Sequence, residues 1–325
     1  MNQIALLLVA IFGVPLALIG YLALGEWLLE RTSSERARAI RPWVWIAPAL
    51  AFLGMFLIYP ALSTALSSFR DASGTNFVGL ANYGFVFSNR DTLSSMGNNV
   101  LWLVFYTAFA VGFGLLAAIL ADRVRYGGAV KTVMFMPMAI SNVAAGVIWK
   151  FMYDYRPPGL PQTGTVNAAL GAVIPGFQPV AWLITAATNN IALMLVGVWI
   201  IAGFCMVILS AGIRGIPEEV LEAARIDGAS DWQVFARVMI PLLMPTVIVV
   251  STTMVINALK VFDIVYVMTN GNYNTDVIAN QMYKQLFITR DLGRASAIAM
   301  VLLLAIIPVM IVNIRRYREQ MGSNA

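Results

Sequence analysis

Long apolar stretches separated by short polar segments are the main pattern in this 325-residue sequence. A helix needs about 20 mostly apolar residues to cross a lipid bilayer. Seven stretches are long enough, and they are residues 4–24, 44–66, 100–121, 132–153, 191–213, 240–262 and 295–314. The pattern predicts an all-α, polytopic membrane helix bundle with about seven transmembrane helices.

The composition agrees with lipid as the solvent for much of the surface. Hydrophobic residues make up 60% of the chain and charged residues 11%, whereas soluble domains have about 25% charged residues. A disordered chain is excluded and a soluble globule is disfavoured. The sequence contains no histidine and a single cysteine, Cys205, so the commonest general base and the usual zinc ligands are missing. We therefore expect no catalytic residue and no metal site.

The distribution of basic residues predicts the orientation in the membrane. Thirteen of the 21 Lys and Arg residues lie in the segments 25–43, 122–131, 214–239 and 315–325, which would all share one side of the bilayer. An excess of Lys and Arg marks the cytoplasmic side. We expect the N-terminus outside and the C-terminus in the cytoplasm.

The first apolar stretch resembles a signal peptide in length only. It lacks a basic n-region, and no clear small-residue cleavage site follows it. We predict that residues 1–43 form an N-terminal transmembrane helix with a cytoplasmic connector. Residues 44–318 are expected to form one transmembrane domain with a cytoplasmic loop at 214–240, and residues 319–325 a cytoplasmic tail.

The loop at residues 214–240 is patterned as a helix, a glycine turn and a second helix. Pro217 suits a first helical position, and Glu218 and Glu219 complement the positive end of a helix dipole. Gly228 supplies a helix stop, and a second apolar pattern begins at Trp232. From this pattern alone, a solvated connector and a partner-binding element are equally good interpretations.

A motif in this loop favours the second interpretation. The string Glu-Ala-Ala-x-x-Asp-Gly-Ala is formed by Glu222, Ala223, Ala224, Asp227, Gly228 and Ala229. Together with Pro241 ahead of the next span, it resembles the "EAA" signature of bacterial ABC-importer permeases. Val238 and Ile240 depart mildly from the Ile and Leu usual in that family. The resemblance implies that these six residues dock into a groove on a cytoplasmic ATPase and transmit its closure to the membrane helices.

The resemblance covers roughly residues 45–318. The segments 136–141, 262–271 and 292–297 are similar to sugar-importer permeases of the maltose type, and most of all to α-glucoside (disaccharide) permeases. This implies the type I ABC-importer architecture in a bacterial plasma (inner) membrane, within which the chain forms half of an alternating-access pathway. The implied partners are a second homologous permease, two ATPase subunits, an extracytoplasmic solute-binding protein, a small-molecule sugar and membrane lipid, with no nucleic acid.

The same resemblance implies that ATP hydrolysis belongs to a partner chain. The sequence has no Gly-x-x-x-x-Gly-Lys-Ser/Thr phosphate loop, which agrees with this division of labour. We expect this chain to be a transport subunit with no cofactor of its own, while the partner ATPase binds ATP and Mg.

Polar residues within the predicted spans are candidates for the substrate pathway. They are Ser141 and Asn142 in the fourth span and Thr253 and Asn257 in the sixth. A neutral sugar requires hydrogen-bond donors and acceptors together with an aromatic face. Asn142 and Asn257 are preferred because an amide offers both a donor and an acceptor. Hydrogen bonding between helices is the competing role for all four residues.

Other residues complete the expected pathway. The spacing of four residues places Pro137 on one helix face with Ser141. Trp149, Trp199 or Tyr153 would supply the aromatic face. Lys260 and Asp263 lie at the outer end of the sixth span. A structural ion pair between them is favoured over a gate contact.

Three alternatives remain. An ion-coupled secondary transporter usually binds its ion through charged residues at membrane depth, and the central parts of these spans contain none. Proton coupling is therefore disfavoured, whereas a sodium site made of neutral oxygens stays open. A membrane enzyme has few candidate catalytic groups here. An ABC permease for a non-sugar solute is the third alternative.

Overall fold

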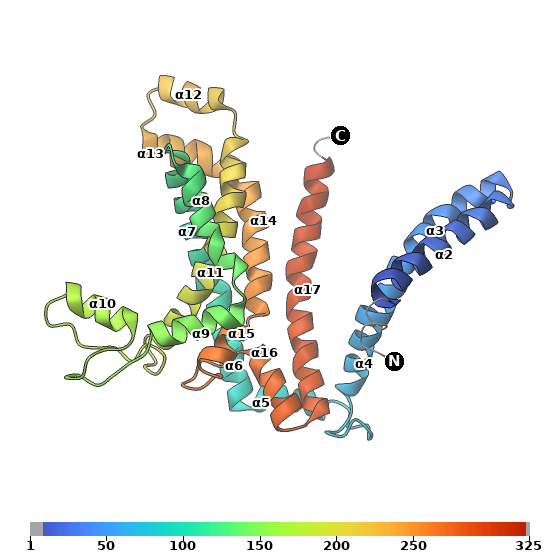
Figure 1. Ribbon diagram of the computed structural model, residues 1–325, viewed down its shortest axis with the longest axis horizontal. Helices are drawn as coiled ribbons and strands as arrows, with labels where there is room; N and C mark the ends of the chain where they lie inside the picture. Colours follow the sequence, from blue (N-terminus) through green and yellow to red (C-terminus); the bar gives the residue numbers. More distant parts are fainter. Residues whose placement is uncertain (1–8, 323–325) are drawn as a thin grey trace. The chain divides into compact units, whose positions relative to one another are not determined.

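The computed structural model describes residues 9–322, and most of them are helical (Figure 1). The chain divides after Leu66 into two compact units, Met1–Leu66 and Ser67–Ala325. The described residues contain no strand beyond one isolated antiparallel bridge between Arg70 and Phe77. The all-α prediction is confirmed.

The first unit is built on two antiparallel helices joined by a short turn at residues 31–33. Glu26 pairs with Arg41 at 3.0 Å and accepts a hydrogen bond from Trp45 Nε1 at 2.7 Å. Tyr21 donates to the carbonyl of Val44 at 3.1 Å. The elements are η1 (Val9–Gly13, a π-helix), α2 (Val14–Glu30), α3 (Ser34–Leu53), η2 (Gly54–Ile58, a π-helix) and α4 (Tyr59–Ser67).

This arrangement differs from the connector expected at residues 25–43. Helix α2 continues to Glu30 and α3 begins at Ser34, so most of the connector is helical. Arg36, Arg38 and Arg41 of this segment lie on α3, whereas Arg31 lies in the turn that follows α2. Helix α3 also runs unbroken past residue 43. The start of the first predicted span, residues 4–8, lies outside the described residues, as do residues 323–325 of the predicted tail.

The second unit contains the remaining helices. The elements before the EAA loop are α5 (Ala81–Ser88), α6 (Arg90–Leu101), η3 (Trp102–Tyr106, a π-helix), α7 (Thr107–Asp122), α8 (Gly127–Phe135), η4 (Met136–Ala139, a 3-10 helix), α9 (Asn142–Met152), α10 (Thr165–Val173) and α11 (Asn189–Arg214). Those that follow are α12 (Glu218–Ile226), α13 (Asp231–Gln233), η5 (Val234–Met239, a π-helix), α14 (Ile240–Leu259), α15 (Asp263–Met268), α16 (Ile278–Tyr283), η6 (Lys284–Ile288, a π-helix) and α17 (Leu292–Gly322).

The described helices are long and apolar enough for six or seven membrane crossings, which confirms the expected number. Six are continuous: Ile11–Glu30, Ser34–Ser67, Arg90–Asp122, Asn189–Arg214, Asp231–Leu259 and Leu292–Ile311. The seventh is a bent pair, Gly127–Ala139 with Asn142–Met152.

The bent pair corrects the straight helix expected at residues 132–153. The chain turns by 100° between its two halves. Pro137 opens the 3-10 turn η4, and Ser141 then caps α9 by accepting a hydrogen bond from the Ala144 N–H at 3.2 Å. Pro137 and Ser141 therefore belong to different elements rather than to one helix face. A proline and a capping serine together end one helix and start another.

Helix α11 forms the core of the second unit, where it packs against α7, α8 and α14. Small residues allow this close approach. A Cβ on Gly114 of α7 would lie 2.5 Å from Cys205 Cβ, and one on Gly203 would meet the backbone of Met134. Cys205 is fully buried at this contact. Close packing across small residues is the usual way in which membrane helices associate.

Candidate functional site

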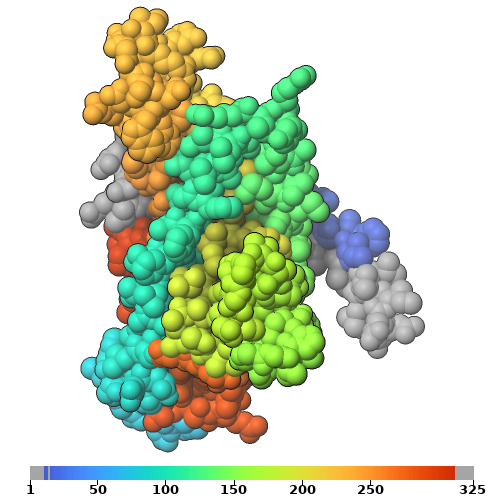
Figure 2. Space-filling view, turned by 90° about the vertical axis from the view of Figure 1, so that its left-hand side faces the viewer, coloured from blue at the N-terminus to red at the C-terminus, as the bar shows by residue number. Residues whose placement is uncertain are grey.

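The EAA loop, residues 214–240, projects from one end of the second unit (Figure 2). Helix α12 lies outside the candidate membrane spans, whereas the short α13 begins the continuous span Asp231–Leu259. Ile226 is 86% exposed and Trp232 is 71% exposed, and Glu222 and Asp227 are also at the surface. The loop thus displays apolar side chains and acids together on a surface that the described residues leave exposed.

Local hydrogen bonds hold the loop in its helix–turn–helix form. Gly228 has a φ of +86°, and its N–H donates to the Arg225 carbonyl at 3.0 Å. The Ala229 N–H donates to the Ala224 carbonyl at 3.0 Å. These two bonds and the left-handed residue define a Schellman motif, which ends a helix cleanly. Ser230 and Gln233 then form a capping box at the start of α13.

A polar hub fixes the base of the EAA loop. Asp122, at the end of α7, pairs with Lys131 of α8 at 2.6 Å and with Arg214 of α11 at 2.8 Å. Ser210 donates to the second oxygen of Asp122 at 2.8 Å and also contacts Lys131. The hub ties three helices together at Arg214, four positions before α12 begins at Glu218.

A cavity of about 300 Å³ lies among the membrane helices, and we call it the span cavity. It is lined by Trp102, Tyr106, Asn142, Gly197, Ile200, Ile201, Asn257, Lys260, Val261, Phe262, Asp263 and Ile264. The lining comes from η3, α9, α11, α14 and α15. The structure thus brings together the two preferred candidates, Asn142 and Asn257, although 115 positions separate them in the sequence.

The polar groups of the span cavity are balanced in charge. Asn142 donates a hydrogen bond to Asp263 at 3.3 Å. Lys260 also lines the cavity, but the ion pairs of the described residues do not join it to Asp263, so the expected pair is not formed. One cation, one carboxylate and two amides therefore face the same space. This is an environment for a neutral, hydrogen-bonding solute.

The other two candidate polar residues have local roles in this structure. Ser141 caps α9, and Thr253 donates its hydroxyl to the Val249 carbonyl at 3.1 Å. Neither residue lines the span cavity. Their contribution to a substrate pathway stays a prediction.

The aromatic residues expected beside the substrate lie elsewhere. Trp149 packs edge-on against Trp199 with ring centroids 5.6 Å apart, and it also contacts Tyr153 at 5.3 Å. These three residues line a separate, apolar cavity of about 590 Å³. They are packing partners rather than walls of the span cavity.

Sequence reasoning missed the aromatic wall of the span cavity. Trp102 and Tyr106 provide it, with ring centroids 5.5 Å apart. Both belong to the π-helix η3, a distortion that is frequent at functional sites. Gly197 of α11 makes room for them, because a Cβ there would lie 2.9 Å from Tyr106 Cε2. The Trp102 Nε1 group is buried without a hydrogen-bond partner among the described residues.

An aromatic cluster supports the α15 wall of the span cavity. Phe262 stacks on Tyr266 with centroids 5.2 Å apart, and Tyr283 contacts both rings. The Tyr266 and Tyr283 hydroxyls lie 3.3 Å apart, and this hydrogen bond raises the pKa of Tyr283.

Among the described residues there is no group of three or more His, Cys, Asp or Glu side chains that would hold a metal ion.

Comparisons with known proteins match this architecture. Residues 110–317 match the family described as "binding-protein-dependent transport system inner membrane component". The osmoprotective compounds uptake permease protein GgtC of Synechocystis sp. is 53% identical over 85% of this chain and 99% of its own. The alpha-glucoside transport system permease protein AglF of Rhizobium meliloti is 47% identical over 89% of this chain and 85% of its own.

A solved structure shares the fold. A chain of a bacterial ABC transporter involved in the import of the acidic polysaccharide alginate superimposes with a TM-score of 0.74. The match covers 88% of this chain and 99% of that chain, at 23% sequence identity.

Proposed function

Because the chain belongs to the family of binding-protein-dependent transport system inner membrane components, the permease subunits of ABC importers, we propose that it forms half of the import pathway for a neutral sugar or a sugar-like osmoprotectant. Membership of this family makes it a transport subunit rather than an enzyme, and it replaces the alternative of an ion-coupled secondary transporter. The two relatives that support this solute class carry osmoprotective compounds and alpha-glucosides, respectively.

The span cavity is the observation that carries the proposal. Asn142 and Asn257 each offer a donor and an acceptor for hydroxyl groups, and Trp102 and Tyr106 offer ring faces for the C–H surface of a sugar. Lys260 and Asp263 leave no net charge there. A disaccharide of the α-glucoside type fits this combination better than an anion or a polyamine.

Substrate-stimulated ATP hydrolysis by the reconstituted importer tests the solute class. We expect a disaccharide or glucosylated polyol from a panel to raise the rate. Asn257→Ala should weaken the response by about two- to tenfold in apparent KM, since one hydrogen bond contributes about 0.5–1.5 kcal/mol. Thr252→Ala is the matched control on α14, because its hydroxyl bonds to the Ile248 carbonyl away from the cavity. Stimulation by amino acids, phosphate esters or polyamines instead would overturn the solute class.

The EAA loop is the proposed contact with the ATPase. The exposed surface of α12 supports docking into a groove on the partner. The six motif residues lie in α12 or directly after it: Glu222, Ala223, Ala224, Asp227, Gly228 and Ala229. Co-purification tests this contact. Glu222→Lys should release the ATPase, whereas Glu35→Lys, an exposed charge reversal in the first unit, should retain it. Equal retention by both variants contradicts the docking assignment.

The remaining features of the assembly follow from the same proposal. The chain pairs with a second homologous permease, two ATPase subunits that bind ATP and Mg, and an extracytoplasmic binding protein. It lies in the bacterial inner membrane with its N-terminus outside and its C-terminus in the cytoplasm. In this arrangement residues 1–43 precede a transport domain at 44–318, and the EAA loop faces the cytoplasm.

A further inference from the structure

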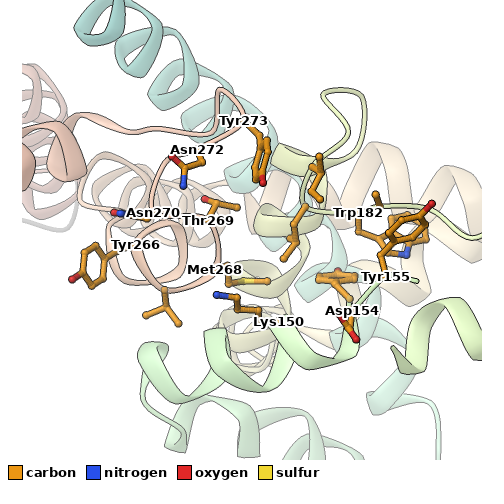
Figure 3. Close-up of a pocket in the computed structure, with 15 residues that line it drawn as sticks. Lys150, Asp154, Tyr155, Trp182, Tyr266, Met268, Thr269, Asn270, Asn272 and Tyr273 are labelled. Atoms are coloured by element: carbon orange, nitrogen blue, oxygen red, sulfur yellow. The ribbon is translucent and has the colours of Figure 1, made fainter. Parts of the chain in front are cut away.

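A second cavity, of about 630 Å³, lies among the loops of the second unit (Figure 3), and we call it the loop cavity. Its lining includes Lys150, Tyr155, Trp182, Asn270, Asn272 and Tyr273. Asn189, the first residue of α11, donates to the Tyr273 carbonyl at 2.7 Å. The loop cavity therefore lies at the end of α11 that is opposite to the EAA loop.

One wall of the loop cavity is fixed by a buried amide. Asn167 of α10 is 1% exposed. Its Oδ1 accepts hydrogen bonds from Trp182 Nε1 at 2.9 Å and from the Val180 N–H at 3.1 Å. Its Nδ2 donates to the carbonyls of Val180 and Asp154. Trp182 is thereby held with its ring 6.1 Å from that of Tyr153, and both rings line the cavity.

The opposite wall is a strained loop at residues 269–276. Asn270, Tyr273 and Asn274 all have left-handed backbones, with φ of 52°, 58° and 61°. A non-glycine residue in this conformation costs about 1–3 kcal/mol, and such strain clusters at ligand clamps, where the surrounding structure over-determines it. Tyrosine is the costliest of the three, because asparagine visits this region readily.

Buried hydrogen bonds impose that conformation. Thr269 and Thr275, both buried, share a hydrogen bond between their hydroxyls at 2.7 Å. Asn98 donates to the Asn274 carbonyl at 2.9 Å, from α6. A Cβ on Gly271 would collide with the carboxylate of Asp276. The loop is held rigidly, and its Asn270, Asn272 and Tyr273 side chains line the cavity.

The loop cavity has one positively charged donor, the ammonium group of Lys150. Lys150, in the last turn of α9, lies at the cavity (Figure 3), and the ion pairs of the described residues do not include it. Asp154 also lines the cavity, but its carboxylate accepts a hydrogen bond from Thr163. Rings, amides, one ammonium group and one carboxylate therefore line a space whose volume lies in the range of small-molecule sites.

The two cavities share one wall. Helix α15 contributes Asp263 and Ile264 to the span cavity, and its residues Tyr266 and Met268 to the loop cavity. Ile264 and Tyr266 are two positions apart, so less than one turn of helix separates the two sets of residues. Helix α15 therefore forms the partition between the two cavities.

From these observations we propose that the loop cavity is a separate binding subsite for a sugar or polyol, occupied before the solute enters the span cavity. The proposal rests on the proposed function, that is, on a hydroxylated solute. Trp182 and Tyr273 supply faces for the C–H surface of the ring. Asn270, Asn272 and Lys150 supply donors and acceptors for its hydroxyl groups.

Protection of an engineered thiol from labelling tests the subsite. Cys205, the single cysteine of the chain, is fully buried. Ile184→Cys places a reporter in the lining without removing a polar group, since Ile184 is 51% exposed there. Maleimide labelling is measured on the importer complex in proteoliposomes, with trehalose, sucrose or maltose added. Labelling should slow by about tenfold at ten times the Kd, because only unoccupied sites react.

Matched variants separate the two cavities. Protection should persist with Asn257→Ala, which alters the span cavity, and should be lost with Tyr273→Ala or Lys150→Ala. Val173→Cys, on α10 outside the lining, should label at the same rate with and without sugar. Protection that is lost with Asn257→Ala and kept with Tyr273→Ala would place the sugar in the span cavity and overturn the subsite.

The same preparation distinguishes failure of the subsite from failure of the proposed function. If a sugar stimulates ATP hydrolysis by the Ile184→Cys complex but never changes its labelling rate, the subsite is wrong and the function stands. If none of the three sugars stimulates hydrolysis while a chemically unrelated solute does, the proposed function is wrong, and the subsite fails with it.

Discussion

Two glycines of the second unit are required for opposite physical reasons. Gly197 is required for space, because a Cβ there would lie 2.9 Å from Tyr106 and 3.3 Å from Trp102. Gly228 is surrounded by open space, but its φ of +86° is one that other residues rarely adopt. The first glycine shapes the span cavity and the second ends α12.

Gly197→Ala should push the Trp102 and Tyr106 rings toward the span cavity. We expect a higher KM for transport of the stimulating sugar, with assembly of the complex retained. Gly112→Ala on α7 is the matched control, because a Cβ there meets no atom within 4 Å. Uptake into proteoliposomes measures both variants. An unchanged KM for Gly197→Ala would show that the rings do not contact the solute.

Gly228→Val should disrupt the end of α12 and weaken binding of the ATPase. A left-handed backbone costs a residue with a side chain roughly 1–2 kcal/mol. Gly228→Asn should be much milder, since asparagine tolerates this conformation. The amount of ATPase that co-purifies distinguishes the two. If both variants release the ATPase equally, the backbone conformation is not the reason that glycine is needed.

Among the elements, the hub around Asp122 links the membrane helices to the EAA loop. It joins the end of α7 to α8 and to the last turns of α11. Asp122 and Lys131 are only 19% and 17% exposed at their side chains, so solvent screens this pair weakly. A movement of α12 would reach α7 and α8 through these contacts.

Asp122→Asn should therefore lower both stability and coupling. Loss of hydrogen bonds to a charged group destabilises by roughly 1.5–3 kcal/mol, which lowers the temperature at which the purified complex loses activity. The ratio of sugar transported to ATP hydrolysed should also fall. Arg123→Ala, at the neighbouring exposed position, controls for a charge change at this end of α7. A normal transport ratio with reduced stability would make the hub purely structural.

At the scale of the second unit, the proposed sites lie at opposite ends of one helix. Helix α11 has 26 residues, which correspond to a length of about 39 Å. Its first residue supports the loop cavity, its middle lines the span cavity, and the EAA loop follows its last turn. This order along α11 suits a permease in which the solute enters near the start of the helix and the ATPase binds beyond its end.

The orientation of this axis in the membrane can be measured with the same thiol chemistry. Val173 on α10 and Ile226 on α12 are 79% and 86% exposed, and these two helices lie far apart in the second unit (Figure 1). In intact spheroplasts, a membrane-impermeant maleimide should label Val173→Cys at once. Ile226→Cys should be labelled only after permeabilisation. The reverse pattern would invert the proposed topology.

The sequence by itself determined the class of protein and the form of the EAA loop. Both depend on local signals: the length of an apolar run sets a membrane crossing, and Pro217, Gly228 and the acids near them set a short capped helix. Tertiary structure decided which residues line the cavities. Trp102, Asn142, Asn257 and Asp263 come from separate helices, and no local pattern shows that they meet. The same holds for the strained loop at 269–276, because Asn98 and Asn189, which are distant in the sequence, hydrogen-bond to its backbone.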